Sequence, residues 1–396
     1  MPDFEIVREK LDQAVQVLEE QGLDLWLTFV RETSQVSDPC LDLLLGFGLT
    51  WTSALMVSRT GERIAIVGRF DADNVRRMGG YTTVVGYDQS IRESLLEHLS
   101  RLNPRQVALN FSESDPAADG LTHGLYRVLT KMLSGTEYGR CLVSAEALVG
   151  ALRGRKSPAE VAHIQAAVRA AETVFRRAGG LIRPGMTERE VARLFHDTTR
   201  QEGLEPAWEA DYCPAVTAGP ASPVGHAMPG DFTVERGHLL QVDFGVRREG
   251  FVSDLQRTWY VLAEGETTPP PEVLAGWQAA RGALEAGRAA LRPGVRGWEV
   301  DQAARQALVQ AGYPEFMHAF GHHVGRCAHD GATVLGPRWE KYGTSIEGVV
   351  EPGNVFAIEL GVQVPGRGYV GCEEDVLVTP QGAEYLSEPQ VELWCV

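Results

Sequence analysis

The segments VERGHLLQVDFGV (residues 234–246) and VEPGNVFAIELGV (residues 350–362) decide the architecture of the second part of this chain. They share valine, glutamate and glycine in the same register, and each places an acid, Asp243 or Glu359, inside an apolar run of strand-like composition. A carboxylate is rarely buried unless it is paired or ligated, because removing its charge from water is costly. The two segments are therefore predicted to be strands that carry functional acids.

A second acid follows each of these segments. Asp254 lies eleven residues after Asp243, and Glu373 lies fourteen residues after Glu359. A glycine-containing turn stands between the two acids in both cases, so each pair fits a hairpin that returns the second acid beside the first. Two hairpins would then deliver two carboxylates each.

The repeat extends beyond the hairpins. The phrase RPGMTEREV (residues 183–191) recurs as RPGVRGWEV (residues 292–300), and each phrase leads into a helical pattern that ends at a glycine. Ser157-Pro158-Ala159-Glu160 opens a further helix with a capping box. The sequence thus predicts an internal duplication of helix, turn, helix and carboxylate hairpin, with a central site made by both halves.

A histidine-rich run contains further candidate metal ligands and acid or base groups. HAFGHHVGRCAHD (residues 318–330) contains four of the ten histidines of the chain, and imidazole is both a metal ligand and an acid or base near neutral pH. Four buried carboxylates carry too much charge for one divalent ion, so the even duplication indicates two ions. Oxygen-rich ligands favour manganese, cobalt or iron(II). The implied reaction class is metal-assisted hydrolysis.

The first part of the chain has a different pattern. Residues 1–152 alternate strand-like and helical runs, which predicts an α/β domain. Neither a Gly-x-Gly-x-x-Gly nor a Gly-x4-Gly-Lys-Ser/Thr pattern occurs there, so we interpret it as a structural or dimerisation domain. The boundary is expected near Leu152, and residues 153–396 are expected to form an α+β catalytic domain with pseudo-two-fold duplication.

Composition excludes several other classes of function. The chain of 396 residues is 44% hydrophobic and 23% charged, with a formal net charge of −16. That charge argues against nucleic acid and anionic membranes as partners, because both select a basic face. No transmembrane-length apolar run or signal peptide is evident, so a cytoplasmic location is expected. The six cysteines are scattered, which supports no disulfide framework.

These motifs together resemble the M24 metallopeptidase family, also known as the creatinase/methionine aminopeptidase superfamily, which has the pita-bread fold. The resemblance is carried by Asp243-Phe-Gly with Asp254, by Gly321-His322-x-x-Gly325 with His329, by Ile358-Glu359-x-Gly361, and by Glu373 ahead of Thr379. The added N-terminal domain makes the whole chain look like the Xaa-Pro peptidase branch, which includes prolidase and aminopeptidase P.

The resemblance implies a dinuclear peptidase for proline-containing peptides, with a metal-bridging water as nucleophile. The implied metal ligands are Asp243, Asp254, His322, Glu359 and Glu373, with Asp254 and Glu373 in the bridging positions. The oxygen-rich ligand set makes manganese the expected metal, with cobalt, zinc or iron also possible, and the resemblance implies a homodimer.

Several further roles follow from the same resemblance. Glu359 matches the carboxylate that takes a proton from the attacking water. His226 and His329 match histidines that donate to the substrate carbonyl or the oxyanion, and His318 matches a histidine near the proline pocket.

Three positions depart from the family pattern. His323 replaces a glycine after the ligand histidine, Gly371 replaces an arginine, and Arg326 stands where the family has an apolar residue. We therefore expect His323 either to narrow or re-polarise the pocket or to point away from it into solvent, and Arg326 to supply a relocated clamp for a substrate carboxylate. That clamp would favour a carboxypeptidase.

Three more functions are compatible with the same fold. They are a metal-free binding protein, creatinase-like hydrolysis without metal, and a methionine aminopeptidase. The intact ligand set argues against the first two functions, and the N-terminal domain argues against the third.

Overall fold

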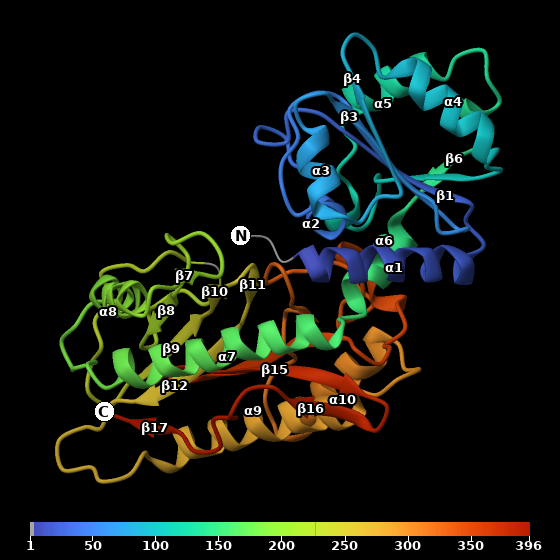
Figure 1. Ribbon diagram of the computed structural model, residues 1–396. Coiled ribbons are helices and arrows are strands. Elements are labelled where there is room, and N and C mark those ends of the chain that lie inside the picture. Colours follow the sequence, from blue (N-terminus) through green and yellow to red (C-terminus); the bar gives the residue numbers. More distant parts are fainter. Residues whose placement is uncertain (1–3, 226) are drawn as a thin grey trace. The chain divides into compact units, whose positions relative to one another are not determined.

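The computed structural model describes residues 4–225 and 227–396. The chain divides into two compact units, Met1–Arg153 and Gly154–Val396 (Figure 1).

The first unit is an α/β domain. Its described residues form a mixed six-stranded sheet in the order β4-β3-β2-β1-β5-β6. The elements are α1 (Phe4–Gln21), β1 (Leu25–Val30), α2 (Leu41–Leu44), β2 (Ser53–Ser58), β3 (Arg63–Gly68), α3 (Ala72–Met78), β4 (Thr83–Tyr87), α4 (Arg92–Leu102), β5 (Val107–Leu109), α5 (His123–Met132), β6 (Leu142–Ser144) and α6 (Glu146–Gly154). Short 3-10 turns lie at Pro116–Ala118 and Tyr138–Arg140.

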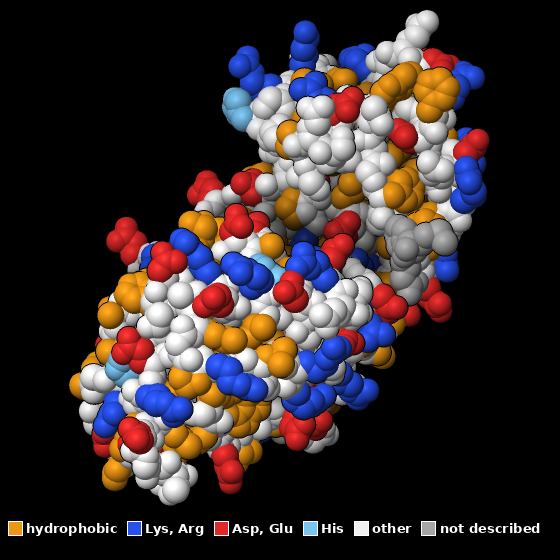
Figure 2. Space-filling model, turned by 90° about the vertical axis from the view of Figure 1, so that its left-hand side faces the viewer, with side chains coloured by type: hydrophobic (Ala, Val, Ile, Leu, Met, Phe, Trp, Pro, Cys, Tyr) orange, Lys and Arg blue, Asp and Glu red, His pale blue; other side chains and the backbone are white. Residues whose placement is uncertain are grey.

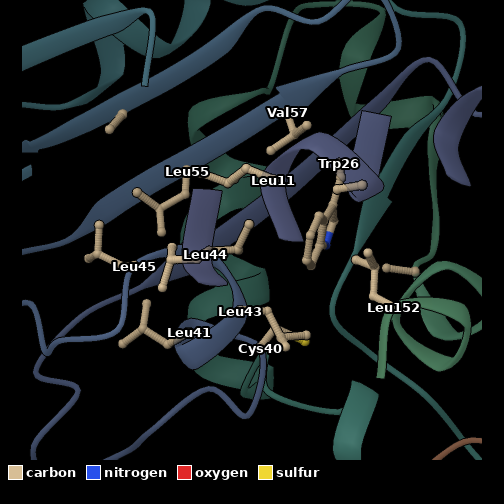
Figure 3. Packing of buried hydrophobic residues seen from close by; sticks show 14 of the residues in the cluster. Leu11, Trp26, Cys40, Leu41, Leu43, Leu44, Leu45, Leu55, Val57 and Leu152 are labelled. Atoms are coloured by element: carbon tan, nitrogen blue, oxygen red, sulfur yellow. The ribbon is translucent and has the colours of Figure 1, made fainter. Parts of the chain in front are cut away.

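An apolar cluster holds this unit together. Figure 3 shows Leu11 from α1, Trp26 from β1, Leu44 from α2 and Leu152 from α6 converging on one another, and each is at most 1% exposed. The indole nitrogen of Trp26 donates to Oδ1 of Asn110 at 2.6 Å, so its polar group is satisfied inside the core. The sheet is covered by helices, which is why β1 is an unbroken buried run.

The second unit contains two helix pairs and a long sheet. The described strands of this sheet run in the order β13-β14-β15-β12-β9-β8, with β16 paired to β15 and β17 to β12. The elements are α7 (Pro158–Gly179), α8 (Glu188–Gln201), β7 (Glu205–Pro206), β8 (Ala215–Ala218), β9 (Leu239–Phe244), β10 (Val246–Arg248), β11 (Phe251–Val252), β12 (Leu255–Tyr260), α9 (Pro271–Ala290), α10 (Gly297–Gln310), β13 (Gly321–His323), β14 (Val355–Val364), β15 (Gly368–Thr379), β16 (Gly382–Tyr385) and β17 (Trp394–Cys395). Short 3-10 turns lie at Glu340–Tyr342 and Ser345–Glu347.

The predicted duplication is present in the backbone. Gly185 and Gly294 both adopt the left-handed region, with φ of 93° and 91°. The amide of Gly185 donates to the carbonyl of Val234 at 2.8 Å, and the amide of Gly294 donates to the carbonyl of Val350 at 2.9 Å. Each Arg-Pro-Gly turn is therefore fixed by the same hydrogen bond to the segment that leads into its own carboxylate strand, five residues before that strand begins. In the view of Figure 1, α7 lies above β15 and α9 lies below it.

Local capping explains where the helices begin. Ser157 and Glu160 form the predicted capping box of α7, and Thr187 and Glu190 form another at α8. Each serine or threonine hydroxyl accepts from the amide of the glutamate, whose carboxylate in turn accepts from the capping residue's amide. These bonds satisfy amides that a helix end leaves without partners.

The glycine two residues after each first acid has a steric reason. A Cβ atom on Gly245 would lie 1.9 Å from the carbonyl oxygen of Ser253, and one on Gly361 would lie 2.2 Å from the carbonyl oxygen of Val370. No real Cβ approaches a backbone oxygen so closely. In both halves the returning strand therefore passes over a position where only glycine fits.

The surface carries mixed charges on the face that Figure 2 shows. Basic and acidic side chains are interspersed there with small apolar areas. Among the helices of residues 4–225 and 227–396, none combines the length and apolarity needed to cross a bilayer.

We predict that Gly361→Ala lowers the unfolding free energy by about 1–3 kcal/mol, because the new methyl group collides with backbone. Gly282→Ala is the matched control. Gly282 lies in α9 with no atom within 4 Å of an added Cβ, so alanine there should be neutral or stabilise by up to about 1 kcal/mol. Urea unfolding of both variants measures the difference. Equal stabilities would contradict the steric explanation.

Candidate metal centre

Four side chains of the site stand in one row across the sheet. Glu359 on β14 lies directly opposite Glu373 on β15, Glu373 lies opposite Gln256 on β12, and Gln256 lies opposite Asp243 on β9. Neighbouring strands are about 4.8 Å apart. The antiparallel register therefore brings acids that are up to 130 residues apart in sequence, Asp243 and Glu373, to one place.

Asp254 and His322 complete the cluster. Asp254 immediately precedes β12, and its carboxyl is near enough to that of Asp243 for the charge of Asp243 to raise the pKa of Asp254. Nε2 of His322 lies 3.9 Å from Oδ2 of Asp254, 3.9 Å from Oε1 of Glu359 and 4.0 Å from Oε1 of Glu373. The five residues predicted as ligands thus converge from both halves of the duplicated unit.

This geometry fits divalent cations. Ligand atoms about 2.0–2.2 Å from one ion lie roughly 3–4 Å from each other, which matches the spacing around Nε2 of His322. Ligand atoms of Asp254, His322 and Glu373 all lie within 4.8 Å of one another. Oδ1 of Asp243 and Oε2 of Glu373 are buried without a hydrogen-bond partner among the described residues. Buried carboxylate oxygens of this kind need a cation or a proton.

His322, the predicted histidine ligand, is held in the tautomer that metal binding through Nε2 requires. Nδ1 of His322 lies 3.0 Å from the carbonyl oxygen of Ala328, and because a carbonyl can only accept, Nδ1 carries the proton. Nε2 is then left as a lone pair that faces the carboxylates. Such a bond from the second ring nitrogen is the usual support of a metal-binding imidazole.

The loop that offers this carbonyl is anchored by a buried ion pair. Nζ of Lys156 lies 2.8 Å from Oδ2 of Asp330, and the two side chains are 1% and 3% exposed. The amide of Asp330 donates to the carbonyl of His323 at 2.9 Å. Lys156 therefore fixes the end of the loop that follows His322, although it lies far from His322 in sequence.

Burial and mutual repulsion favour the protonated acids when no cation is bound. Burial raises the pKa of Asp243 to about 7 and, with the charge of Asp243, the pKa of Glu359 to about 8. The pKa values of Asp254 and Glu373 are raised well above their ordinary range by burial and by the neighbouring carboxylates. The cluster can therefore exchange protons for metal ions.

A cavity of about 600 Å³ opens onto the acids. All five predicted ligands line it, as do two of the predicted catalytic and substrate-binding residues, His329 and His318. The rings of His329 and His322 lie 4.3 Å apart, nearly perpendicular. His226, the other predicted catalytic histidine, lies outside the described residues.

His323, which we predicted to bind substrate, occupies a different environment. Successive residues of a strand point to opposite faces, so β13 directs His322 to the acids and His323 into the core. The His323 ring is 1% exposed and lies 4.1 Å from the ring of Phe356. Burial, together with Lys156, lowers its pKa well below the ordinary value. We therefore correct the prediction: His323 is a neutral core residue.

Arg326 also lies away from the predicted position. Its guanidinium lies over the ring of Phe251, with Cζ 4.9 Å from the ring centroid, and the described lining of the cavity does not include it. Arg247 lines the cavity instead, and its guanidinium donates to the carbonyls of Arg326 and Ala207. Arg326 is therefore not placed to hold a substrate carboxylate in this cavity, as the predicted clamp would require.

Sequence reasoning missed several residues of the cavity that share one feature. Each lies two or four positions from a ligand in the same extended segment, so the period of two places its side chain on the same face. They are Gln241, Gln256 and Tyr369. Counting every second residue along the strand from Asp243, Asp254 and Glu373 would have predicted these positions, because such residues share a face. Asp375, also missed, accepts from the amide of Asp254 at 3.0 Å.

Comparisons with known proteins identify a family of peptidases. The model of the family described as "Metallopeptidase family M24" matches residues 162–380. An uncharacterised peptidase of Staphylococcus saprophyticus is 26% identical over 96% of this chain and 99% of its own length. A Xaa-Pro dipeptidase of Pyrococcus horikoshii is 27% identical over 80% of this chain and 88% of its own.

Solved structures show the same architecture. The X-Pro aminopeptidase of Thermotoga maritima superimposes with a TM-score of 0.72 at 25% identity, covering 98% of this chain and 99% of that one. The Xaa-Pro dipeptidase of Bacillus anthracis gives a TM-score of 0.76 at 23% identity, with coverage of 98% and 100%. The family match spans more than half of the chain and contains all five converging ligands. This chain therefore belongs to metallopeptidase family M24 and is a peptidase with the pita-bread fold.

Proposed function

We propose that this protein is a dinuclear metal-dependent peptidase that cleaves peptides at proline, as an Xaa-Pro aminopeptidase or an Xaa-Pro dipeptidase. The observation that carries the proposal is the convergence of four buried carboxylates and one oriented imidazole on one cavity. The names of the similar proteins from Pyrococcus horikoshii and Thermotoga maritima support proline as the specificity.

Different residues of the site would bind the metal ions, transfer protons and stabilise charge. Two divalent cations would be held by Asp243, Asp254, His322, Glu359 and Glu373. Oxygen-rich ligands favour manganese, with cobalt, iron or zinc also possible. When bound, such ions lower the pKa of water and polarise a carbonyl.

Glu359, itself one of these ligands, would transfer the proton, and His329 beside them would stabilise charge. Glu359 would accept the proton of the attacking water and deliver it to the leaving nitrogen, since it lines the cavity and burial favours its protonated form. His329, exposed in the cavity beside His322, would donate to the scissile carbonyl as negative charge develops on its oxygen.

Product analysis distinguishes the forms of this activity. Chelator-treated protein is supplied with manganese or cobalt and given three peptides: an Xaa-Pro dipeptide, a longer peptide with proline second, and a peptide with a free residue after a penultimate proline. Loss of the first residue of the longer peptide identifies an aminopeptidase, and cleavage of the dipeptide alone identifies a dipeptidase. Trimming from the carboxyl end, or no cleavage with any metal, would contradict the proposal.

We predict that Glu373→Gln abolishes activity and metal binding while raising the melting temperature of the chelator-treated protein. Burial and the neighbouring carboxylates raise the pKa of Glu373 well above its ordinary range, so folding the chelated protein at neutral pH requires this acid to take up a proton, and a glutamine removes that cost. Calorimetric titration with manganese and thermal unfolding measure the two effects. Glu384→Gln, an exposed glutamate on β16, is the control and should change neither. An active Glu373→Gln variant would exclude this residue as a ligand.

A pH dependence follows from the raised pKa values. With the metal removed, the folded protein keeps protons on Asp243 and Glu359 up to about pH 7 and 8, whereas the unfolded chain releases them near pH 4. Between these limits the folded state binds more protons, so the unfolding free energy falls as pH rises. We therefore expect chelated protein to melt at a lower temperature at pH 8 than at pH 6.

Added manganese should reverse this trend, because metal and protons compete for the same carboxylates. The gain in melting temperature on adding manganese should therefore be larger at pH 8 than at pH 6. Glu359→Gln, which removes one of the titrating groups, should show a shallower pH dependence when chelated. An identical gain at both pH values would contradict this account of the site.

A further inference from the structure

Gln256 is the one residue in the row of four that is not an acid. It lies between Asp243 and Glu373 in the register of the sheet, is 7% exposed and faces the cavity. Its side-chain Nε2 donates to Oε2 of Glu359 at 2.9 Å. A neutral amide at the centre of an acidic row therefore contacts a ligand directly.

The orientation of this amide is fixed by its neighbours. Nε2 of Gln241 donates to Oε1 of Gln256 at 3.0 Å, and Gln241 is 5% exposed. The carboxylate of Glu359 is an acceptor when ionised, so the Gln256 nitrogen must face it and the Gln256 oxygen must face Gln241. The two glutamines form a buried chain of hydrogen bonds that points donors toward Glu359.

The two oxygens of Glu359 are thereby given separate partners. Oε2 accepts from Gln256, whereas Oε1 lies 3.9 Å from Nε2 of His322, on the side where the other ligands converge. A carboxylate without the amide could rotate about its last torsion, which has a broad energy profile. The bond to Gln256 selects one rotation and directs Oε1 to the ligand cluster.

Gly371 provides the space that the amide occupies. A Cβ atom at Gly371 would lie 2.3 Å from Oε1 of Gln256 and 2.9 Å from Cγ of Gln241. Gly371 is on β15, two positions before Glu373, and so on the face of the acids. The side chains of Gln256 and Gln241 therefore occupy the space into which any side chain at this position would extend.

We propose that Gln256, held by Gln241 in the space above Gly371, is a positioning residue that sets the orientation of Glu359 for metal binding and proton transfer. This inference rests on the proposed metallopeptidase function. It assigns Gln256 no contact with the reacting atoms. Its effect is to keep Oε1 of Glu359 aimed at the cations, as hydrogen bonds to ligating carboxylates do elsewhere.

The main test replaces the donor while keeping the volume. For Gln256→Met we expect manganese affinity to fall about tenfold in calorimetric titration of chelator-treated protein, because lost support of a ligand costs about 10–100-fold. The visible absorption bands of the cobalt-loaded protein should shift, because the ligand geometry around the ion changes. In peptide hydrolysis kcat should fall while KM stays within about twofold.

Gln363→Met is the matched control. Gln363 lies on β14 four residues after Glu359 and is exposed, so its replacement should leave manganese affinity and the cobalt spectrum unchanged.

A second variant tests the same contact from the opposite side. Gly371→Ala keeps Gln256 but pushes its side chain away, so it should reproduce the loss of manganese affinity. In a Gln256→Ala background the contact with Oε1 of Gln256 is gone and only Gln241 remains beside the added methyl group, so Gly371→Ala should cause a smaller further loss of manganese affinity than it causes in the wild type. This non-additivity is the signature of one shared contact. Independent losses that add would overturn the proposal.

The outcomes separate this inference from the proposed function. A wild-type protein that binds manganese and cleaves peptide, with a Gln256→Met variant that binds manganese equally and has the same cobalt spectrum, would overturn the inference alone. A lower melting temperature of Gln256→Met with unchanged affinity would do the same, because it indicates only a packing role. A wild type that neither binds manganese nor cleaves peptide would overturn both.

Discussion

The structure of the catalytic unit depends on the free energy of placing four carboxylates together in a buried sheet. Such a cluster is unfavourable unless cations or protons neutralise it. The sheet register makes the cluster unavoidable, because Asp243, Glu359 and Glu373 share one row of neighbouring strands. The fold holds like charges close together, which raises the free energy of the folded unit. Bound cations lower that free energy, so the stability of the unit is linked to its cofactor.

Two kinds of constraint hold the row in place. One is steric: the glycines that follow Asp243 and Glu359 let the returning strand approach where any side chain would collide. The other is hydrogen bonding: His322, Asp254 and Glu359 each have a partner outside the ligand set, namely the carbonyl of Ala328, the carboxylate of Asp375 and the amide of Gln256. A site built this way is preorganised by backbone geometry more than by the ligands themselves.

The sequence predicted the second unit well because its signals were local and repeated. An acid inside an apolar run, a glycine two residues later and a repeated Arg-Pro-Gly turn each have one simple physical meaning, and together they located the five residues that converge. The misplaced residues, His323 and Arg326, share a cause. Their direction depends on which face of a three-residue strand and which side of a loop they occupy, and the side chains that decide it, Phe356 and Phe251, are distant in sequence. Gln256 was not predicted, because a single glutamine in a strand does not by itself indicate a functional role.

The buried pair of Lys156 and Asp330 has a consequence for dividing this protein into parts. Lys156 precedes the capping Ser157 by one residue, so a shortened polypeptide that begins at the capping box would keep every ligand and every helix of the catalytic unit but lose the cation of the pair. Asp330 would then lose its buried counter-charge, at the end of the loop that orients His322. The minimal catalytic fragment therefore begins before the first residue of its first helix, in what looks from sequence like a connecting segment.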